Sequence, residues 1–365
     1  MDGFDEKIQE ILKLVVTCRY LAARKEYNDI LSALEEPVVS AAVREAVTLY
    51  LEKDDTVQTM LKRAALIERS IHFVDTSDDW ILGADMFGIQ THYRKCEDDE
   101  NAIVVKIEGK LDDLPLFEQM AVLHEIDLYK EWAPFCTSSV MVDKIGNAEL
   151  FGYLCVGLPM FSRDFLMHAY AGDCMQEFGK VVILGHSVEK HPDDSKEKSV
   201  PWKSCGWLHK RMHVQDMEAV VEALSPNTAQ MKIICRVDLN APLPHTLINF
   251  LIRKLAGVIL YMIQRQTVKV QHDDQCNHAQ RIRSNHAFYR DWLLPKLRHY
   301  CDVKGWLQPT IKALGTDGLP SLSTGALPVV PPTMDTSNVE TEIEVENEEE
   351  ELLSSGEVVL SSELD

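Results

Sequence analysis

The chain has 365 residues, enough for two compact domains or for one large domain with appendages. Its hydrophobic content of 45% and its charged content of 26% are ordinary for a globular protein that buries a sizeable core. Residues 335–365 carry 12 acidic side chains and no Lys or Arg, within a total net charge of −21. This acidic balance argues against nucleic acid as a partner, because neutralising phosphates requires a surplus of cations.

The nine cysteines have no repeating spacing, so they predict free thiols in a reducing compartment and not a disulfide framework. The N-terminus opens with Asp2, Asp5 and Glu6, unlike the basic and then apolar start of a signal peptide. The most apolar stretch, 247–263, is interrupted by two cations, whereas a spanning helix needs about 20 largely uncharged residues. We therefore expect a cytoplasmic protein.

The first segment, residues 1–72, is predicted to be helical. Ile8, Ile11, Leu12 and Val15 recur at three- and four-residue intervals, and Pro37 interrupts the pattern where one helix could end and the next begin. Such a segment is either a helical-repeat module that binds a protein partner or an appendage that caps the main domain. A single copy of the pattern favours the appendage.

From about residue 73 the hydrophobic period changes to two, which predicts β-strands. Alternating apolar residues occur in 101–111 and 231–239, and strands are also expected at 148–157, 164–171, 180–189 and 205–224. One helix is predicted at 115–131, and a long helix at 244–268 closes the series. Few helices separate the later strands, so we expect antiparallel pairing. The fold class is therefore α+β, with a curved antiparallel sheet wrapped around a long C-terminal helix over residues 73–270.

Two further segments follow the predicted sheet domain. Residues 271–312 are polar with helical potential, and residues 313–365 are rich in Gly, Pro, Ser, Thr and finally Glu, which predicts a disordered acidic tail. Residues 244–300 hold nine Lys and Arg against three Asp. The tail could fold back on this basic region and weaken contact with anionic lipid, although a solvating tail is the simpler interpretation.

Four stretches of sequence, in this order, resemble the START (StAR-related lipid transfer) domains of the Bet v 1-like superfamily. The matching residues are Trp80, Gly88, Ile89, Tyr93 and Arg94, then Asp127, Tyr129 and Trp132, then Pro159, Arg163 and Asp164, and finally the stretch 238–250. The third match has one residue fewer than usual between Pro and Arg. In the fourth, Asp238-Leu-Asn-Ala replaces the usual Asp-Pro-Gly-Gly turn. The resemblance covers about 190 residues.

The resemblance implies a helix-grip fold with a hydrophobic tunnel for a sterol, a phospholipid, a ceramide or a similar lipid. A loop before the Arg-Asp strand and the C-terminal helix would close the tunnel. Both are apolar in this sequence, so together they could shelter a lipid or touch a bilayer. The expected lipid-binding residues are Leu158, Pro159, Met160, Phe161, Arg163, Ile248, Leu251, Ile252, Leu255, Ile259 and Met262.

Arg163 and its neighbour Asp164 admit two interpretations. A structural ion pair that fixes the loop is the simpler one, because a buried charge is tolerated only when it is paired. In the other, Arg163 grips a lipid phosphate with two hydrogen bonds.

Other chemistry has weak support in the sequence. Cys205, His209 and His213 recur every four residues, but polar residues on a strand face are commoner than a zinc site, so we expect no metal. There is no nucleophile elbow and no Gly-rich phosphate loop. His124, Glu125 and His168 are the only acid–base candidates for a tunnel enzyme, and each is better explained as structural.

We therefore expect a non-enzymatic protein that binds a lipid and transfers it between membranes. It would need no cofactor and would touch membrane surfaces transiently. One alternative is a START-fold adaptor or ligand sensor that acts through protein partners of the helical N-terminus and the tail. A Bet v 1-like tunnel enzyme is the other.

Overall fold

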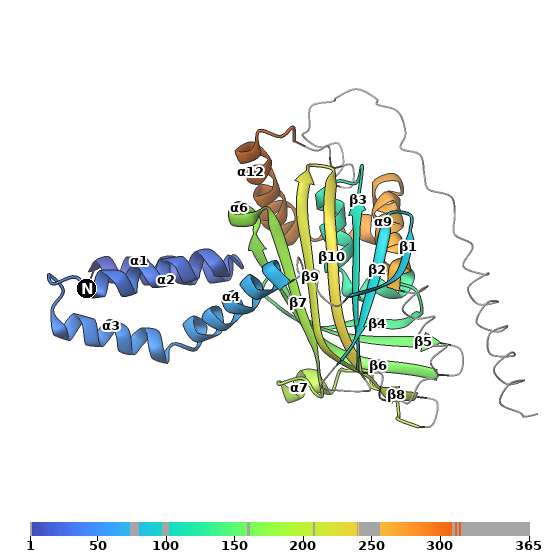
Figure 1. Ribbon diagram of the computed structural model, residues 1–365, viewed down its shortest axis with the longest axis horizontal. Coiled ribbons are helices and arrows are strands. Elements are labelled where there is room, and N and C mark those ends of the chain that lie inside the picture. The colour runs from blue at the N-terminus through green and yellow to red at the C-terminus, as the bar shows by residue number, and fades with distance from the viewer. Residues whose placement is uncertain are drawn as a thin grey trace, which may run out of the picture.

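The computed structural model describes residues 2–73, 80–96, 102–158, 161–206, 209–238, 240, 256–308, 311 and 314. They form a ten-stranded sheet with helices on both of its faces (Figure 1). The strands are β1 (Ile81–Met86), β2 (Ile89–Lys95), β3 (Ala102–Leu111), β4 (Cys136–Ile145), β5 (Glu149–Leu158), β6 (Phe161–Cys174), β7 (Lys180–Val188), β8 (His209–Arg211), β9 (His213–Ser225) and β10 (Thr228–Asp238).

The helices divide into an N-terminal group, short connections and a C-terminal group. They are α1 (Asp2–Val16), α2 (Tyr20–Leu34), α3 (Ala41–Lys53), α4 (Asp55–Phe73), α5 (Leu116–His124), the 3-10 helix η1 (Ile126–Glu131), α6 (Met175–Phe178), α7 (Asp194–Glu197), α9 (Ala256–His272), α10 (Asn277–Ser284), α11 (His286–Phe288), the π-helical segment η3 (Tyr289–Leu293) and α12 (Leu294–Lys304).

The sheet order is β1-β2-β3-β10-β9-β7-β6-β5-β4, and every neighbouring pair along this path is antiparallel. The short strand β8 pairs with β6 in parallel, off this path. The sheet curves around α9 and α5 (Figure 1). The predicted α+β helix-grip architecture, preceded by an α-helical segment, is therefore confirmed.

Several boundaries differ from the sequence prediction. The pattern does not predict strands β1 and β4, and the single strand predicted at 205–224 is instead divided into the short β8 and the long β9. The helix predicted at 115–131 is interrupted at Glu125, whose backbone leaves helical angles at φ −86° and ψ 72°. Helix α9 runs four residues beyond the predicted end at 268, and residues 244–255 lie outside the described residues.

The N-terminal helices cover the outer, convex face of the sheet and also extend away from it (Figure 1). Buried apolar side chains of the sheet share one core with α1, α2, α3 and α4. The sheet residues of this core are Val104, Tyr170, Cys174, Val182, Leu184, Val220 and Ile234. The approach is close at Gly172 of β6, where a Cβ would lie 2.4 Å from the Ile67 Cδ1 of α4. The outer face is therefore a packed helix–sheet interface.

An ion-pair network ties α4 to this outer face. The Arg63 guanidinium donates to both carboxylate oxygens of Glu149 at 2.9 and 2.6 Å, and the His168 Nε2 lies 2.8 Å from the same carboxylate. Arg63 also donates to the Tyr20 hydroxyl and lies over the Tyr170 ring. Because a two-point contact fixes both planes, this network orients α4 on the sheet.

The inner, concave face packs against α9 at the end of the sheet that β1, β2 and β3 form. Leu260 and Ile263 of α9 are buried with Ile107, Leu111 and Met231 of the sheet. Gly109 of β3 permits this contact, since a Cβ there would lie 2.7 Å from the Leu260 Cδ2. Side chains of α5, α10 and α12 join the same core. The domain boundaries at 72, 270 and 312 stay predictions, and all but one residue of the predicted acidic tail lies outside the described residues.

Among the described residues, no helix has the length and apolar character needed to cross a bilayer.

The Arg63–Glu149 network predicts an acid-dependent loss of stability. Burial acts to raise the pKa of Glu149, but hydrogen bonds from His168 and Arg63 outweigh it and lower the pKa to about 2, against 4.5 for the free group. Because the pKa of Glu149 is lower in the folded chain than in the unfolded chain, ionised Glu149 stabilises the fold above the unfolded pKa. This contribution to the free energy of unfolding is about 3 kcal/mol, and it is lost as the pH falls from about 5 to about 2. We expect Glu149→Gln to remove this part of the pH dependence in urea unfolding between pH 7 and pH 3.

Glu68→Gln is the matched control. Glu68 pairs with Arg24 at 2.7 Å, but its side chain is 47% exposed, so its replacement should cost under about 1 kcal/mol at pH 7. Equal pH profiles of wild type and Glu149→Gln would contradict the assignment.

Candidate functional site

The inner face of the sheet carries a row of apolar side chains across five strands at mid-height. The register aligns Tyr93 with Val105, Val105 with Cys235, Cys235 with Met217, and Met217 with Gly185. Tyr93, Val105, Cys235 and Met217 are only half-buried, although they come from β2, β3, β10 and β9 in the interior of the sheet. We call these four residues with Gly185 the inner row.

On the opposite face, the apolar residues that share a core with the N-terminal helices are buried. Val104 precedes Val105, Ile234 precedes Cys235, and Val220 lies three residues beyond Met217 on β9; each keeps only 4–6% of its surface. Because successive residues of a strand point to opposite faces, this difference separates the two sides of one sheet. The side chains under the N-terminal helices are packed, whereas those of the inner row keep accessible surface.

Cys235 combines a protein-surrounded sulfur with accessible side-chain surface. Burial raises the pKa of its thiol to about 12, so protein surrounds the sulfur and disfavours the thiolate. The same side chain nevertheless keeps accessible area and packs with Met217 and Val237 at the edge of an apolar cluster. Tyr129 combines the same two properties: burial raises the pKa of its hydroxyl, and the side chain is half-buried.

Methionines are frequent in this apolar cluster of the inner face. Met167 is buried, and Met141, Met212 and Met217 pack around the cluster as half-buried side chains. Phe165 and Leu154 are the less flexible side chains of the same cluster. Unbranched thioether side chains adapt to irregular shapes, so this wall can change its contour at low energetic cost.

Arg163 lies on the inner face at the start of β6. It faces Val156 across the β5–β6 pair and shares its side of the strand with Phe165 and Met167. The side chain is 4% exposed, its Nη1 donates to the Ser162 carbonyl at 2.9 Å, and burial lowers the pKa of the guanidinium. A cation therefore stands beside the apolar side chains of this part of the inner wall.

Asp164 points to the outer face, so it does not form the expected ion pair with Arg163. Its carboxylate accepts hydrogen bonds from the Tyr153 hydroxyl at 3.0 Å and from the Lys203 backbone N–H at 3.3 Å. The His209 Nε2 of β8 lies 3.2 Å away. Neighbouring residues of a strand diverge, and this corrects the sequence interpretation. Asp164 fixes β8 and the segment before it, while Arg163 belongs to the inner wall.

The predicted lipid-binding residues fall into three groups. Ile259 and Met262 of α9 are half-buried and pack against the core under that helix. Leu158 and Phe161 pair at the ends of β5 and β6. Pro159, Met160, Ile248, Leu251, Ile252 and Leu255 lie outside the described residues. The sequence pattern does not single out the inner row as a site, although its alternating positions in 101–111 and 231–239 are the signal that predicts those strands.

The START-like motif residues mostly have structural roles. The Trp80 ring lies beneath Lys106 and Arg94, with the cations 5.1 and 5.0 Å from its centre. Asp127 accepts from Arg281 at 2.8 Å. Tyr129 and Trp132 form an edge contact with ring centres 4.8 Å apart. These contacts fix strands and connections around the inner face.

The acid–base candidates do not gather on the inner face. His168 lies on the outer face beside Glu149. Glu125 accepts from the Tyr289 hydroxyl at 2.6 Å and from Arg281 at 2.7 Å, next to His124. Burial acts to raise the pKa of Glu125, but the hydrogen bonds from His124 and Tyr289 and the charge of Arg281 lower it to about 2. Such a carboxylate is a fixed anion that holds α10 to α5.

The three residues suggested as zinc ligands, Cys205, His209 and His213, do not form a metal site. His209 is engaged with Ser162 and Asp164, and Cys205 and His213 are exposed. Within the described ranges, no three His, Cys, Asp or Glu side chains are placed to hold a metal ion.

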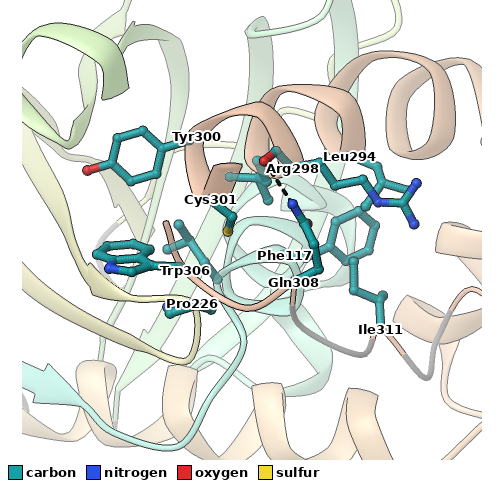
Figure 2. A pocket seen from close by; sticks show the side chains of 11 residues that line it. Phe117, Pro226, Leu294, Arg298, Tyr300, Cys301, Trp306, Gln308 and Ile311 are labelled. Carbon is teal, nitrogen blue, oxygen red and sulfur yellow. Dashed lines mark hydrogen bonds between the residues drawn. The ribbon is translucent and has the colours of Figure 1, made fainter. Parts of the chain in front are cut away.

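A hollow of about 380 Å³, counting the part open to solvent, lies outside the inner face. Figure 2 shows Phe117 of α5, Pro226 of the β9–β10 turn and Leu294 and Cys301 of α12 around it. Gln308 closes one side by donating to the Arg298 carbonyl at 3.0 Å. None of the predicted lipid-binding residues lines this hollow.

No protein-family profile matches this sequence, and no curated protein matches it either. Among solved structures, human STARD10 is similar in fold, with 17% identity, a TM-score of 0.49 and coverage of 67% of this chain and 88% of that chain. Human StAR-related lipid transfer protein 5 has 14% identity and a TM-score of 0.47, covering 58% of this chain and 98% of that chain. A STAR-related lipid transfer protein from Xanthomonas axonopodis has 16% identity and a TM-score of 0.42, and the match covers 52% of this chain and 99% of that chain. At these identities the likeness concerns the fold alone.

The opposite orientations of Arg163 and Asp164 can be tested by a double-mutant cycle. We expect Asp164→Asn to cost about 2 kcal/mol, because the Tyr153 hydroxyl and His209 lose a charged partner. Arg163→Gln should act independently, with a coupling free energy below about 0.5 kcal/mol in urea unfolding. A coupling of about 2 kcal/mol or more would mean that the two side chains form an ion pair after all.

Proposed function

We propose that this protein binds one lipid against the inner face of its sheet, under the C-terminal helix, and transfers it between membranes without catalysing a reaction. The observation that carries the proposal is the half-burial of the inner row between a packed outer face and α9. Apolar side chains at the centre of a sheet are normally packed to the density of a crystal. A lipid chain would cover the surface that the inner-row side chains leave accessible.

The driving force would be burial of apolar surface. Each Å² of lipid and protein surface removed from water contributes about 25 cal/mol, so a chain lying along several strands gains enough to leave a bilayer transiently. The methionine-rich cluster suits such a ligand, because its side chains can follow chains of different shape.

Arg163 would contact the polar end of the lipid. It is the cation of the inner wall at the start of β6, and Asp164 leaves that wall for the other face of the sheet. A guanidinium suits a phosphate or a carboxylate, which it can bind with two parallel hydrogen bonds. The lipid class would therefore be one with an anionic group, such as a phospholipid.

The closing elements would be the β5–β6 connection and the C-terminal helix. In the β5–β6 connection the lipid-contacting residues would be Leu158, Pro159, Met160 and Phe161. In the C-terminal helix they would be the apolar face from Ile248 to Met262. Opening of this pair at a membrane surface would let a lipid pass in either direction. Contact with the membrane would be peripheral and transient.

An adaptor function is the second candidate, and the N-terminal helices favour it. They extend beyond the sheet (Figure 1); Leu49 and Tyr50 are exposed on α3, and Val38 in the α2–α3 connection is 90% exposed. Exposed apolar side chains on a projecting helical segment suit a protein partner. In that case the inner face would hold no exchangeable lipid.

Native mass spectrometry of the purified full-length chain separates the two functions. We expect a species with one lipid bound, which organic extraction releases and identifies, and transfer of that lipid between vesicles. A chain that is lipid-free after expression and that also fails to move labelled phospholipid would favour the adaptor.

Filling the inner row provides a structural test. Cys235→Phe adds a ring where Cys235 keeps accessible surface, so we expect bound lipid to fall at least about tenfold while the Tm of lipid-free protein stays unchanged or rises. Cys205→Phe is the matched control on an exposed cysteine and should change neither quantity. If Cys235→Phe instead lowers the stability by about 1–3 kcal/mol, the inner face is already filled and the proposal fails.

A further inference from the structure

Cys155 and Lys203 form a close side-chain pair on the outer face, away from the inner row. The Lys203 Nζ lies 3.1 Å from the Cys155 Sγ, although 48 residues separate them in the sequence. Cys155 of β5 is completely buried, whereas Lys203 belongs to an exposed segment before β8. We propose that this pair is an oxidation-sensitive cross-linking site, at which a peroxide joins the two side chains through a sulfenamide bond.

Neighbouring contacts hold the amine at the sulfur. The Lys203 N–H donates to Asp164 at 3.3 Å, and the Trp202 ring makes an edge contact with Tyr153 at 5.6 Å between ring centres. Trp202 also donates to Glu197 at 2.7 Å and lies under the Arg211 guanidinium. Because Trp202 and the Lys203 backbone are both held in place, the amine and the sulfur meet at high effective concentration.

The chemistry balances with hydrogen peroxide as the oxidant. The Cys155 thiol is oxidised to a sulfenic acid, and the peroxide is reduced to water. The neutral Lys203 amine then attacks the sulfur, an N–S bond forms, and the hydroxyl leaves as a second water with one amine proton. In sum, one thiol, one amine and one peroxide give one sulfenamide and two waters.

The other buried cysteines are poorer candidates. Burial raises the pKa of six described thiols, which keeps them protonated and slow to react. They are Cys18, Cys136, Cys174, Cys235, Cys276 and Cys301. At Cys155 the Lys203 Nζ lies 3.1 Å from the sulfur and supplies the group that traps the sulfenic acid.

The cross-link would join the Trp202–Lys203 segment to β5 and close a loop of 48 residues. A link of this length restricts the unfolded chain, so we expect the Tm to rise by about 5 °C and to return when dithiothreitol reduces the bond. This inference stands whether or not the chain binds a lipid.

The test treats the folded full-length chain with hydrogen peroxide in a Cys205→Ser background, which removes a neighbouring thiol. Remaining thiols are alkylated, and the digest is analysed by mass spectrometry. We expect a linked peptide pair of Cys155 and Lys203, lighter than the sum of its parts by two hydrogen atoms. Lys203→Arg keeps the charge without the primary amine and should abolish the pair.

Two results would overturn the inference. One is recovery of Cys155 from folded, oxidised protein as a free thiol or a sulfinic acid without the linked pair. The other is formation of the linked pair equally well in urea-unfolded protein, because the folded geometry would then have no part in the reaction.

Discussion

Strand alternation is the constraint on which the other features of this molecule depend. Each step along a strand crosses from the outer face to the inner face, so adjacent residues of β6 and β10 have different surroundings. Ile234 is buried under the N-terminal helices, while Cys235 keeps accessible surface on the inner side. Arg163 stands on the inner wall, and Asp164 anchors β8 on the outer face. One sheet thereby has different surroundings on its two faces, with the N-terminal helices on the outer face and α9 on the inner face.

The N-terminal helices stabilise the outer face of the sheet. They bury the outer face of the central strands, and the Arg63–Glu149 network fixes their orientation. Gly172 allows Ile67 to approach the backbone of β6. On the inner side, α9 and α5 form a solid core only against one end of the sheet. Different helices therefore stabilise the two faces of the sheet: the N-terminal group packs on the outer face, and α9 and α5 pack on the inner face.

The sequence predicts features that repeat locally and fails where distant residues meet. Strands β3 and β10 follow from a period of two, and the N-terminal helices follow from three- and four-residue spacing. The break at Glu125 has no local signal, because its partners Tyr289 and Arg281 lie more than 150 residues away. The prediction of an Arg163–Asp164 ion pair is wrong, because residues adjacent in a strand point to opposite faces. The attachment of α4 to the sheet has no local signal either, since Arg63 and Glu149 are 86 residues apart.

Asp164 organises the outer-face contacts at the start of β6. Its carboxylate holds the Lys203 backbone and His209, so it positions both β8 and the amine beside Cys155. One residue earlier, the same strand presents Arg163 to the inner wall. The two side chains point to opposite faces and make separate contacts, so each can be changed with little effect on the other. The start of β6 therefore serves the outer contacts and the inner wall independently.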